Sequence, residues 1–411
     1  LRRAAAWPEQ TKSAWAKGGA RLWASPLEGL GFVTILLFLI GSINVFSSSF
    51  VMGSQLLGDN LYFLKRHFVA AMIGLAGMAF IIRQGYSWFL KRITIWSLIT
   101  LALLIAVFFI GVEANGARRW LSIGGVTTFQ PSALAKLVAV LAAAAYIGPR
   151  LDRRSVSLFS YPLLIAAALA ALVTIQPDMG TGMIILGMCL VPYLVAGIPL
   201  REWALLIIGG GIGVAWLIFH AAYRAERILA WFNPDSYSQT SGYQPLQSLL
   251  AIGSGGMKGT GLGMGASKFY YLPEAHTDFA FAVWAQETGF VGSLIVLLLI
   301  GALLCYGVRI ALDATDGRGR IVAVGMLFLI VGQAVGNIAM VLSLLPVTGV
   351  PMPFFSYGGS ALIVNIWSMG LLFSVAVESA RRGKKASQPA QDEPLRRSRL
   401  RLSERLAQHN R

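Results

Sequence analysis

Long apolar runs recur along this chain from about residue 28 to about residue 380, and only short polar gaps separate them. A window of about 19 residues, chosen to match the thickness of a bilayer core, places ten spans along the chain. These spans are 28–48, 67–83, 93–112, 131–148, 159–176, 180–198, 202–221, 279–307, 321–343 and 358–380. The pattern therefore predicts an all-α integral membrane protein, a polytopic bundle of about ten transmembrane helices.

The polar segments divide the chain into three parts. Residues 1–27 form a basic N-terminal tail, 28–380 a single membrane domain, and 381–411 a polar, arginine-rich tail that we expect to be disordered. Within the membrane domain, the segment 222–278 before the eighth span is the longest stretch between spans. We expect it to be a large extracytoplasmic loop.

Composition and charge narrow the class of partner. Hydrophobic residues make up 56% of the chain and charged residues 13%, and the mean hydropathy of +0.66 is far above that of a soluble domain. The net charge is +16, but 5 of the 34 Lys and Arg precede residue 28 and 10 follow residue 380. This distribution favours membrane lipids with anionic headgroups as partners, and not nucleic acid.

Basic residues in alternate loops predict the orientation. The side that carries the two tails has 25 Lys and Arg and the opposite side has 8, with Lys136 inside a span. Because basic loops stay in the cytoplasm, both termini are predicted to be cytoplasmic. The segment 222–278 and the loops around 113–130, 176–180 and 344–357 are then predicted to face outward.

Ionisable residues gather on the predicted outer side. A charge at a helix centre costs about 2.5–3.5 kcal/mol on insertion scales, so charges near spans are functional candidates. Those at the outer loops and outer ends of spans are Glu113, Arg118, Arg119, Lys136, Asp178, Glu274, Asp278 and Glu287. Arg and Lys can hold an anionic headgroup while a carboxylate accepts a proton. The set predicts a site for an anionic lipid substrate.

Several of these residues also have a purely structural interpretation. Lys136 lies about one turn inside its span, where it could reach a diphosphate or extend to the headgroups. Asp178 could serve the site or cap the next helix, and Asp278 is expected to cap the helix after it even if it also acts as a base. His276 is more often structural, and no second ligand supports a zinc site. The glycine-rich run 253–263 lacks the Walker pattern and is expected to be a flexible loop over the substrate.

Five ordered motifs resemble the SEDS family (shape, elongation, division and sporulation), whose members include FtsW and RodA. They are Gly116-Ala117-Arg118-Arg119-Trp120, Phe129-Gln130-Pro131-Ser132 with Lys136, Gln176-Pro177-Asp178-Met179-Gly180-Thr181, Leu272 to Phe279, and Leu345-Pro346-Val347-Thr348-Gly349 leading into Phe355-Ser356-Tyr357-Gly358-Gly359-Ser360. The resemblance covers nearly the whole chain. Its Tyr-Leu-Pro-Glu-Ala-His-Thr-Asp-Phe run is similar to FtsW and favours the division branch.

The resemblance implies ten spans, cytoplasmic ends and glycosyltransferase activity on lipid II, the undecaprenyl-diphosphate-linked disaccharide peptide. Asp278 matches the essential aspartate of the family and is expected to be catalytic. The expected substrate-binding residues are Lys136, Arg119, Trp120, Gln130, Asp178, Glu274, His276, Ser356 and Tyr357. The sequence departs from the family at Ala133 and Gln286, where glutamate is usual.

The resulting hypothesis is an inverting lipid II polymerase in the cytoplasmic (inner) membrane of a bacterium. Asp278 would accept a proton from the attacking hydroxyl, while Lys136 and Arg119 would stabilise the departing diphosphate. No cofactor is evident, although a divalent cation (Mg²⁺ or Mn²⁺) could share that task. A lipid II flippase and a non-catalytic divisome scaffold are the alternatives. A class B penicillin-binding transpeptidase is the partner that the resemblance implies.

Overall fold

The structure is a computed structural model that describes residues 25–114, 117–123, 127–151 and 156–382. Each predicted span coincides with a helix. The helices are α2 (Pro26–Leu57), α3 (Tyr62–Gln84), α5 (Ile93–Ile110), α6 (Pro131–Ile147), α7 (Tyr161–Ile175), α8 (Met179–Ala196), α9 (Leu200–Phe219), α12 (Ala280–Asp313), α13 (Gly317–Val341) and a final helix, Gly359–Arg382. In the described part of the chain, nine of these are long and apolar enough to cross a membrane, and α7 is a shorter apolar helix. The predicted fold class is confirmed.

Shorter elements lie between the spans. They are α4 (Tyr86–Lys91), the strands β1 (Val112–Ala114), β2 (Ala117–Ile123) and β3 (Thr127–Phe129), the helices α10 (Ala222–Phe232) and α11 (Tyr243–Gly255), and the 3-10 turns η1 (Gly148–Arg150), η2 (Pro234–Tyr237) and η3 (Ala266–Lys268). The strands form an antiparallel sheet in the order β1-β2-β3, where only a loop was expected. The segment 222–278 is partly helical, because α10, α11, η2 and η3 all lie within it.

Helix α6 lies at the centre of the bundle. It packs against α5, α7, α8 and α13, and 89% of its apolar window is buried. Small side chains explain this position, because the run Ala142–Ala144 is fully buried and lets neighbouring helices approach closely. The residues that α6 carries near its start are consequently held inside the protein and not at its lipid-facing surface.

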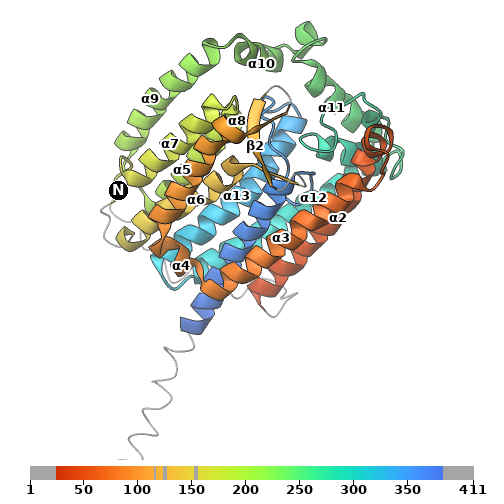
Figure 1. Cartoon of the computed structure of the whole chain (residues 1–411). Coiled ribbons are helices and arrows are strands. Elements are labelled where there is room, and N and C mark those ends of the chain that lie inside the picture. The colour runs from red at the N-terminus through yellow and green to blue at the C-terminus, as the bar shows by residue number, and fades with distance from the viewer. Residues whose placement is uncertain (1–24, 115–116, 124–126, 152–155, 383–411) are drawn as a thin grey trace, which may run out of the picture.

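Helix α9 contrasts with α6 in how little of it is buried. The structure describes this helix throughout, and none of its residues is buried. Figure 1 shows α9 at the outer edge of the bundle, with α10 leading from it toward α11. Its mostly apolar surface suits contact with lipid.

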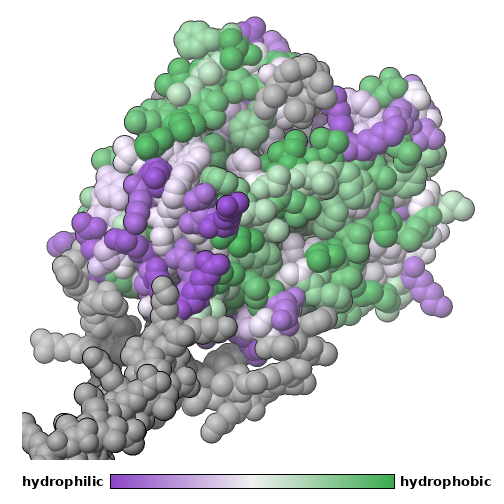
Figure 2. Space-filling view, turned by 60° about the horizontal axis from the view of Figure 1, so that its bottom comes forward, coloured by the Kyte–Doolittle hydropathy of each residue, from purple (hydrophilic) through white to green (hydrophobic). Residues whose placement is uncertain are grey.

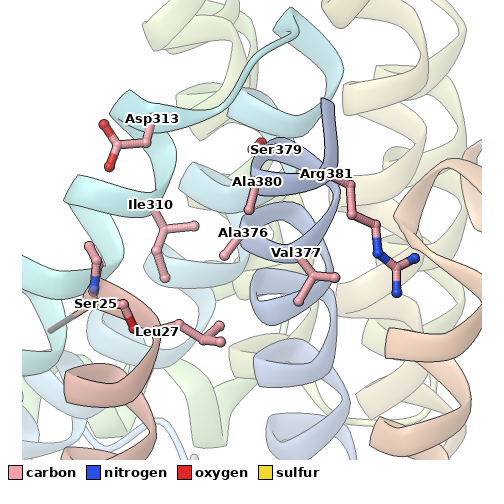
Figure 3. Close-up of a pocket in the computed structure, with 10 residues that line it drawn as sticks. Ser25, Leu27, Ile310, Asp313, Ala376, Val377, Ser379, Ala380 and Arg381 are labelled. Carbon is pink, nitrogen blue, oxygen red and sulfur yellow. The ribbon is translucent and has the colours of Figure 1, made fainter. Parts of the chain in front are cut away.

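Both described ends of the chain meet at one end of the bundle. Ser25 and Arg381 line the same pocket, a cavity of about 490 Å³ (Figure 3). At this end Asp316 accepts hydrogen bonds from Tyr86 Oη at 2.8 Å and from Arg382 Nη1 at 2.6 Å. Figure 2 shows hydrophilic residues at this end of the molecule and hydrophobic surface along its flank. Asp313, which also lines the pocket, is the last residue of α12, so the pocket lies at the opposite end of that helix from Asp278.

The glycine-rich run 253–263 packs against a kink in α12. The kink is at Gly289, whose φ of 69° is left-handed and therefore suits glycine. Gly256 O accepts from Phe290 N at 2.9 Å, and Thr260 N donates to Gln286 O at 3.0 Å. These bonds attach the run to both sides of the kink, which corrects the expectation of a flexible loop over the substrate.

Candidate active site

Asp278 lies two residues before the first residue of α12, Ala280. The cap of this helix is Phe279, and no side-chain cap bond is present among the described residues. The expectation that Asp278 caps the helix is therefore wrong. The cause is the turn before it, because the Glu274 carbonyl accepts the N–H groups of Thr277 and Phe279, both at 3.2 Å, and displaces the helix start by one residue.

The surroundings of Asp278 favour its protonated form more than water does. Burial raises the pKa of its carboxyl to about 7, and the nearby carboxylates of Glu274 and Asp178 act in the same direction. Arg227 and Arg119 oppose this shift. The residue remains partly exposed, and its carboxylate accepts no hydrogen bond from the described residues. It is therefore available to exchange a proton near neutral pH.

Asp178 has the capping role that the sequence offered as one of two interpretations. Its Oδ1 accepts from Thr181 N at 3.1 Å, and its backbone is the cap of α8. Its Oδ2 accepts a longer bond, 3.4 Å, from Gln130 Nε2. One carboxylate thus fixes the start of α8 and links it to the residue that precedes α6.

Lys136 is buried on α6, with 7% of its surface exposed. Its Nζ donates to Gln333 Oε1 on α13 at 3.1 Å, and Asp178 lies close enough to attract it electrostatically. The side chain stays inside the bundle, so its interpretation as a lysine that extends to the lipid headgroups is wrong. An ammonium held here retains donors for an anionic group.

Arg119 on β2 binds the turn that precedes Asp178. Its Nε donates to Gln176 O at 3.1 Å, and its Nη2 donates to Pro177 O. The guanidinium therefore joins the small sheet to the start of α8. Its neighbour Trp120 pairs with Val112 across β1 and β2 and is partly exposed.

His276 belongs to an aromatic cluster beside Asp278. Its ring lies 4.8 Å from that of Phe63 and 5.7 Å from that of Tyr357, and its carbonyl accepts from Tyr357 N at 2.9 Å. Burial lowers the pKa of His276, against the opposing charge of Glu274. A neutral histidine packed between rings fits the structural interpretation.

Ser356 and Glu274 mainly shape the loops around Asp278. Ser356 is buried, and its Oγ accepts from Met352 N at 3.0 Å. Glu274 has a left-handed φ of 55°, and its Oε2 accepts from Thr277 Oγ1 at 2.7 Å. Both side chains are used within their own loops.

The sequence reasoning missed three residues beside the site. Arg227 lies on α10 and acts electrostatically on Asp278, and Gln333 holds Lys136. An added Cβ on Gly349 would lie 3.5 Å from Asp278 Oδ2, so this backbone lies directly beside the carboxylate. The charge of Arg227 was a usable signal, whereas Gln333 and Gly349 offered none beyond their place in a span and in a motif.

The described residues carry no cluster that would hold a divalent cation by protein side chains alone. Nowhere in this part of the chain do three or more His, Cys, Asp or Glu side chains gather as a ligand set. Hard cations need several oxygen ligands at short range. Arg119 and Arg227 are the cations that act on Asp278, and Lys136 is the cation beside Asp178.

These features define a multi-pass membrane protein whose loops and helix ends bring carboxylates and cations together at one end of the bundle. A family model described as "Cell cycle protein", which spans FtsW, RodA and SpoVE, matches residues 29–381. The chain belongs to this family.

Relatives and solved structures agree with that assignment. Stage V sporulation protein E of Bacillus subtilis (strain 168) is 37% identical over 360 residues, covering 86% of this chain and 97% of that protein. A probable peptidoglycan glycosyltransferase FtsW of Geobacter sp. (strain M18) is 36% identical over 363 residues, covering 85% and 97%.

The fold is similar to that of two solved proteins. A chain from a structure of a peptidoglycan synthase complex, described as coordinating polymerization and crosslinking, matches with a TM-score of 0.71 and 29% identity, covering 85% of this chain and 97% of that one. The rod shape determining protein RodA of Thermus thermophilus matches with a TM-score of 0.62 and 28% identity, covering 85% and 96%.

Proposed function

We propose that this protein is a peptidoglycan glycosyltransferase that polymerises lipid II at the outer face of the cytoplasmic membrane. The observation that carries the proposal is the Asp278 carboxyl, with a pKa of about 7, in electrostatic contact with Arg227 and Arg119 at one end of a membrane bundle. Relatives named as peptidoglycan glycosyltransferases supply the reaction class. The same end of the bundle is the one predicted to face outward.

In the proposed reaction, the 4-hydroxyl of an acceptor GlcNAc attacks the anomeric carbon of a lipid-diphosphate-linked MurNAc. The bond from that carbon to the diphosphate oxygen breaks with inversion, and undecaprenyl diphosphate leaves. Asp278 takes the hydroxyl proton as general base. Lys136 and Arg119 stabilise the negative charge of the leaving diphosphate. Because the lipid chains stay in the bilayer, the polar reaction occurs where the helices meet the loops.

The proposal includes the cellular setting. Both termini face the cytoplasm, and the segment 222–278 faces outward. The partner is a single-span class B penicillin-binding transpeptidase that cross-links the new strand. The solved synthase complex, whose description joins polymerization to crosslinking, supports a partner of this kind.

Gel analysis of glycan chains made from purified lipid II tests the proposal. Wild type, alone and with its cognate transpeptidase, is compared with Asp278→Asn. We expect long chains from the wild type and a turnover lower by about 10² or more in the variant, because a general base contributes about 10²–10⁴ in rate.

Asp235→Asn is the matched control, because Asp235 is an exposed aspartate in the same segment 222–278. It should polymerise at the wild-type rate. Near-normal chain synthesis by Asp278→Asn would end the catalytic assignment. An absence of chains from wild type with its partner present, combined with lipid II flux into sealed vesicles, would replace the polymerase by the flippase.

A further inference from the structure

Two buried asparagines from different helices hold the backbone on either side of the α12 start. Asn337 on α13 donates its Nδ2 to Asp278 O at 2.7 Å and to Val350 O at 2.8 Å. Asn44 on α2 donates its Nδ2 to Ala280 O at 3.0 Å. The exposed fractions of the two asparagines are 2% and 1%. The residue proposed as the base is thus held through its own backbone.

The direction of these hydrogen bonds is fixed by their partners. All three acceptors are backbone carbonyls, so the amide nitrogen of each asparagine must face them. The Oδ1 atoms of both asparagines are buried without a partner in the described structure. Replacing either asparagine by alanine would remove the N–H₂ donor from these backbone carbonyls.

Asn337 also fixes the loop that borders the Asp278 carboxylate. Val350 follows Gly349, whose φ of 71° is left-handed and at which an added Cβ would lie 3.5 Å from Asp278 Oδ2. An added Cβ on Gly180 would meet Thr348 O, so the same loop packs on the first turn of α8 after Asp178. The Asn337 side chain therefore holds both the backbone of Asp278 and the loop at Gly349 and Val350 beside its carboxylate.

We propose that Asn337 and Asn44 are positioning residues for Asp278. The inference rests on the proposed function, since it assumes that Asp278 is the base. Neither asparagine needs to touch substrate. Their amides keep the Asp278 carboxylate in the orientation that proton transfer requires, and a misplacement of about 1 Å in such a group can cost about 10² in rate.

The test compares Asn337→Ala and Asn44→Ala with Ser368→Ala. Ser368 is fully buried on the final helix and bonds only its own helix, at Val364 O, so it reports the cost of losing a buried polar group away from the site. Each purified variant is assayed for kcat and KM with lipid II. The fraction of molecules that bind fluorescent lipid II is measured in parallel, because partial unfolding lowers that fraction and a positioning defect does not.

We expect kcat per binding-competent molecule to fall by about 10- to 100-fold in Asn337→Ala. A smaller fall is expected in Asn44→Ala, since Asn44 holds only the helix. KM should stay within about 3-fold and Ser368→Ala should match the wild type. A normal kcat per binding-competent molecule in both asparagine variants would overturn the inference, and so would a loss fully explained by the lower binding fraction.

Asp278→Asn in the same experiment separates the two proposals. An inactive Asp278→Asn beside fully active asparagine variants removes the positioning role and leaves the proposed base. An active Asp278→Asn removes the base itself, and the positioning role with it. If Asn337→Ala does not fold, Asn44→Ala decides, because it removes one hydrogen bond and leaves the loop at Val350 in place.

Discussion

The buried ion pair between Lys268 and Glu287 provides a quantitative test of how the outward segment is attached to the bundle. Lys268 Nζ lies 2.8 Å from Glu287 Oε1, and the two side chains are 3% and 1% exposed. Glu287 also accepts from Ser47 Oγ at 2.7 Å and from Gly263 N at 3.0 Å. The pair therefore ties the chain just before Asp278 to α12 and α2.

The perturbation is Lys268→Met, which keeps an unbranched apolar stem and removes the ammonium. Glu287 would remain buried with only neutral donors, and removing one partner of a buried pair costs about 3–5 kcal/mol of stability. Lys65→Met is the matched control. Lys65 Nζ also lies 2.8 Å from a carboxylate oxygen, of Asp59, but these side chains are 63% and 38% exposed, so its loss should have little effect on stability.

The assay is the thermal unfolding midpoint in detergent of wild type, Lys268→Met, Glu287→Gln and the double variant. Lys268→Met should lower the midpoint by several degrees and Lys65→Met should leave it nearly unchanged. The double variant should be less destabilised than the two single losses combined, by about 0.5–3 kcal/mol, because it leaves no isolated charge. Equal midpoints for Lys268→Met and Lys65→Met, or strictly additive losses in the double variant, would refute the reasoning.

Three further predictions concern the site. The pKa of Asp278 is raised to about 7, and a general base must be deprotonated to act. The polymerisation rate should therefore rise about tenfold per pH unit below pH 7 and level off above it. A flat profile from about pH 5.5 to 8 would contradict this prediction. Arg227→Gln removes a cation that lowers that pKa, so the midpoint of the profile should move to higher pH, and an unchanged or lower midpoint would count against the assignment. Gly349→Ala forces an alanine to a φ of 71° in the loop beside the Asp278 carboxylate, and the resulting shift of that loop should lower kcat by about tenfold. Gly58→Ala has a similar φ of 65° in open space, so it should cost about 1–2 kcal/mol of stability and keep the wild-type kcat. A wild-type kcat in Gly349→Ala would contradict this prediction.

The sequence by itself determined the spans and one helix boundary. Ten apolar runs became helices close to their predicted limits, because the cost of placing polar groups in hydrocarbon depends on local composition. The cap at Asp178 was also readable, since a proline and an acid before an apolar run are local signals. The motifs led to a family to which the chain belongs.

The tertiary structure decided how the site is assembled. The sequence placed Asp278 at the cap of its helix, but the turn at Glu274 moved the helix start. The sequence also offered no indication that Asn337 contacts Asp278, which lies 59 positions earlier, or that Asn44 contacts Ala280, which lies 236 positions later. Hydropathy and motif spacing describe one segment at a time, whereas these contacts depend on which faces of distant helices meet. In this bundle, side-chain packing around α6, α12 and α13 makes that choice.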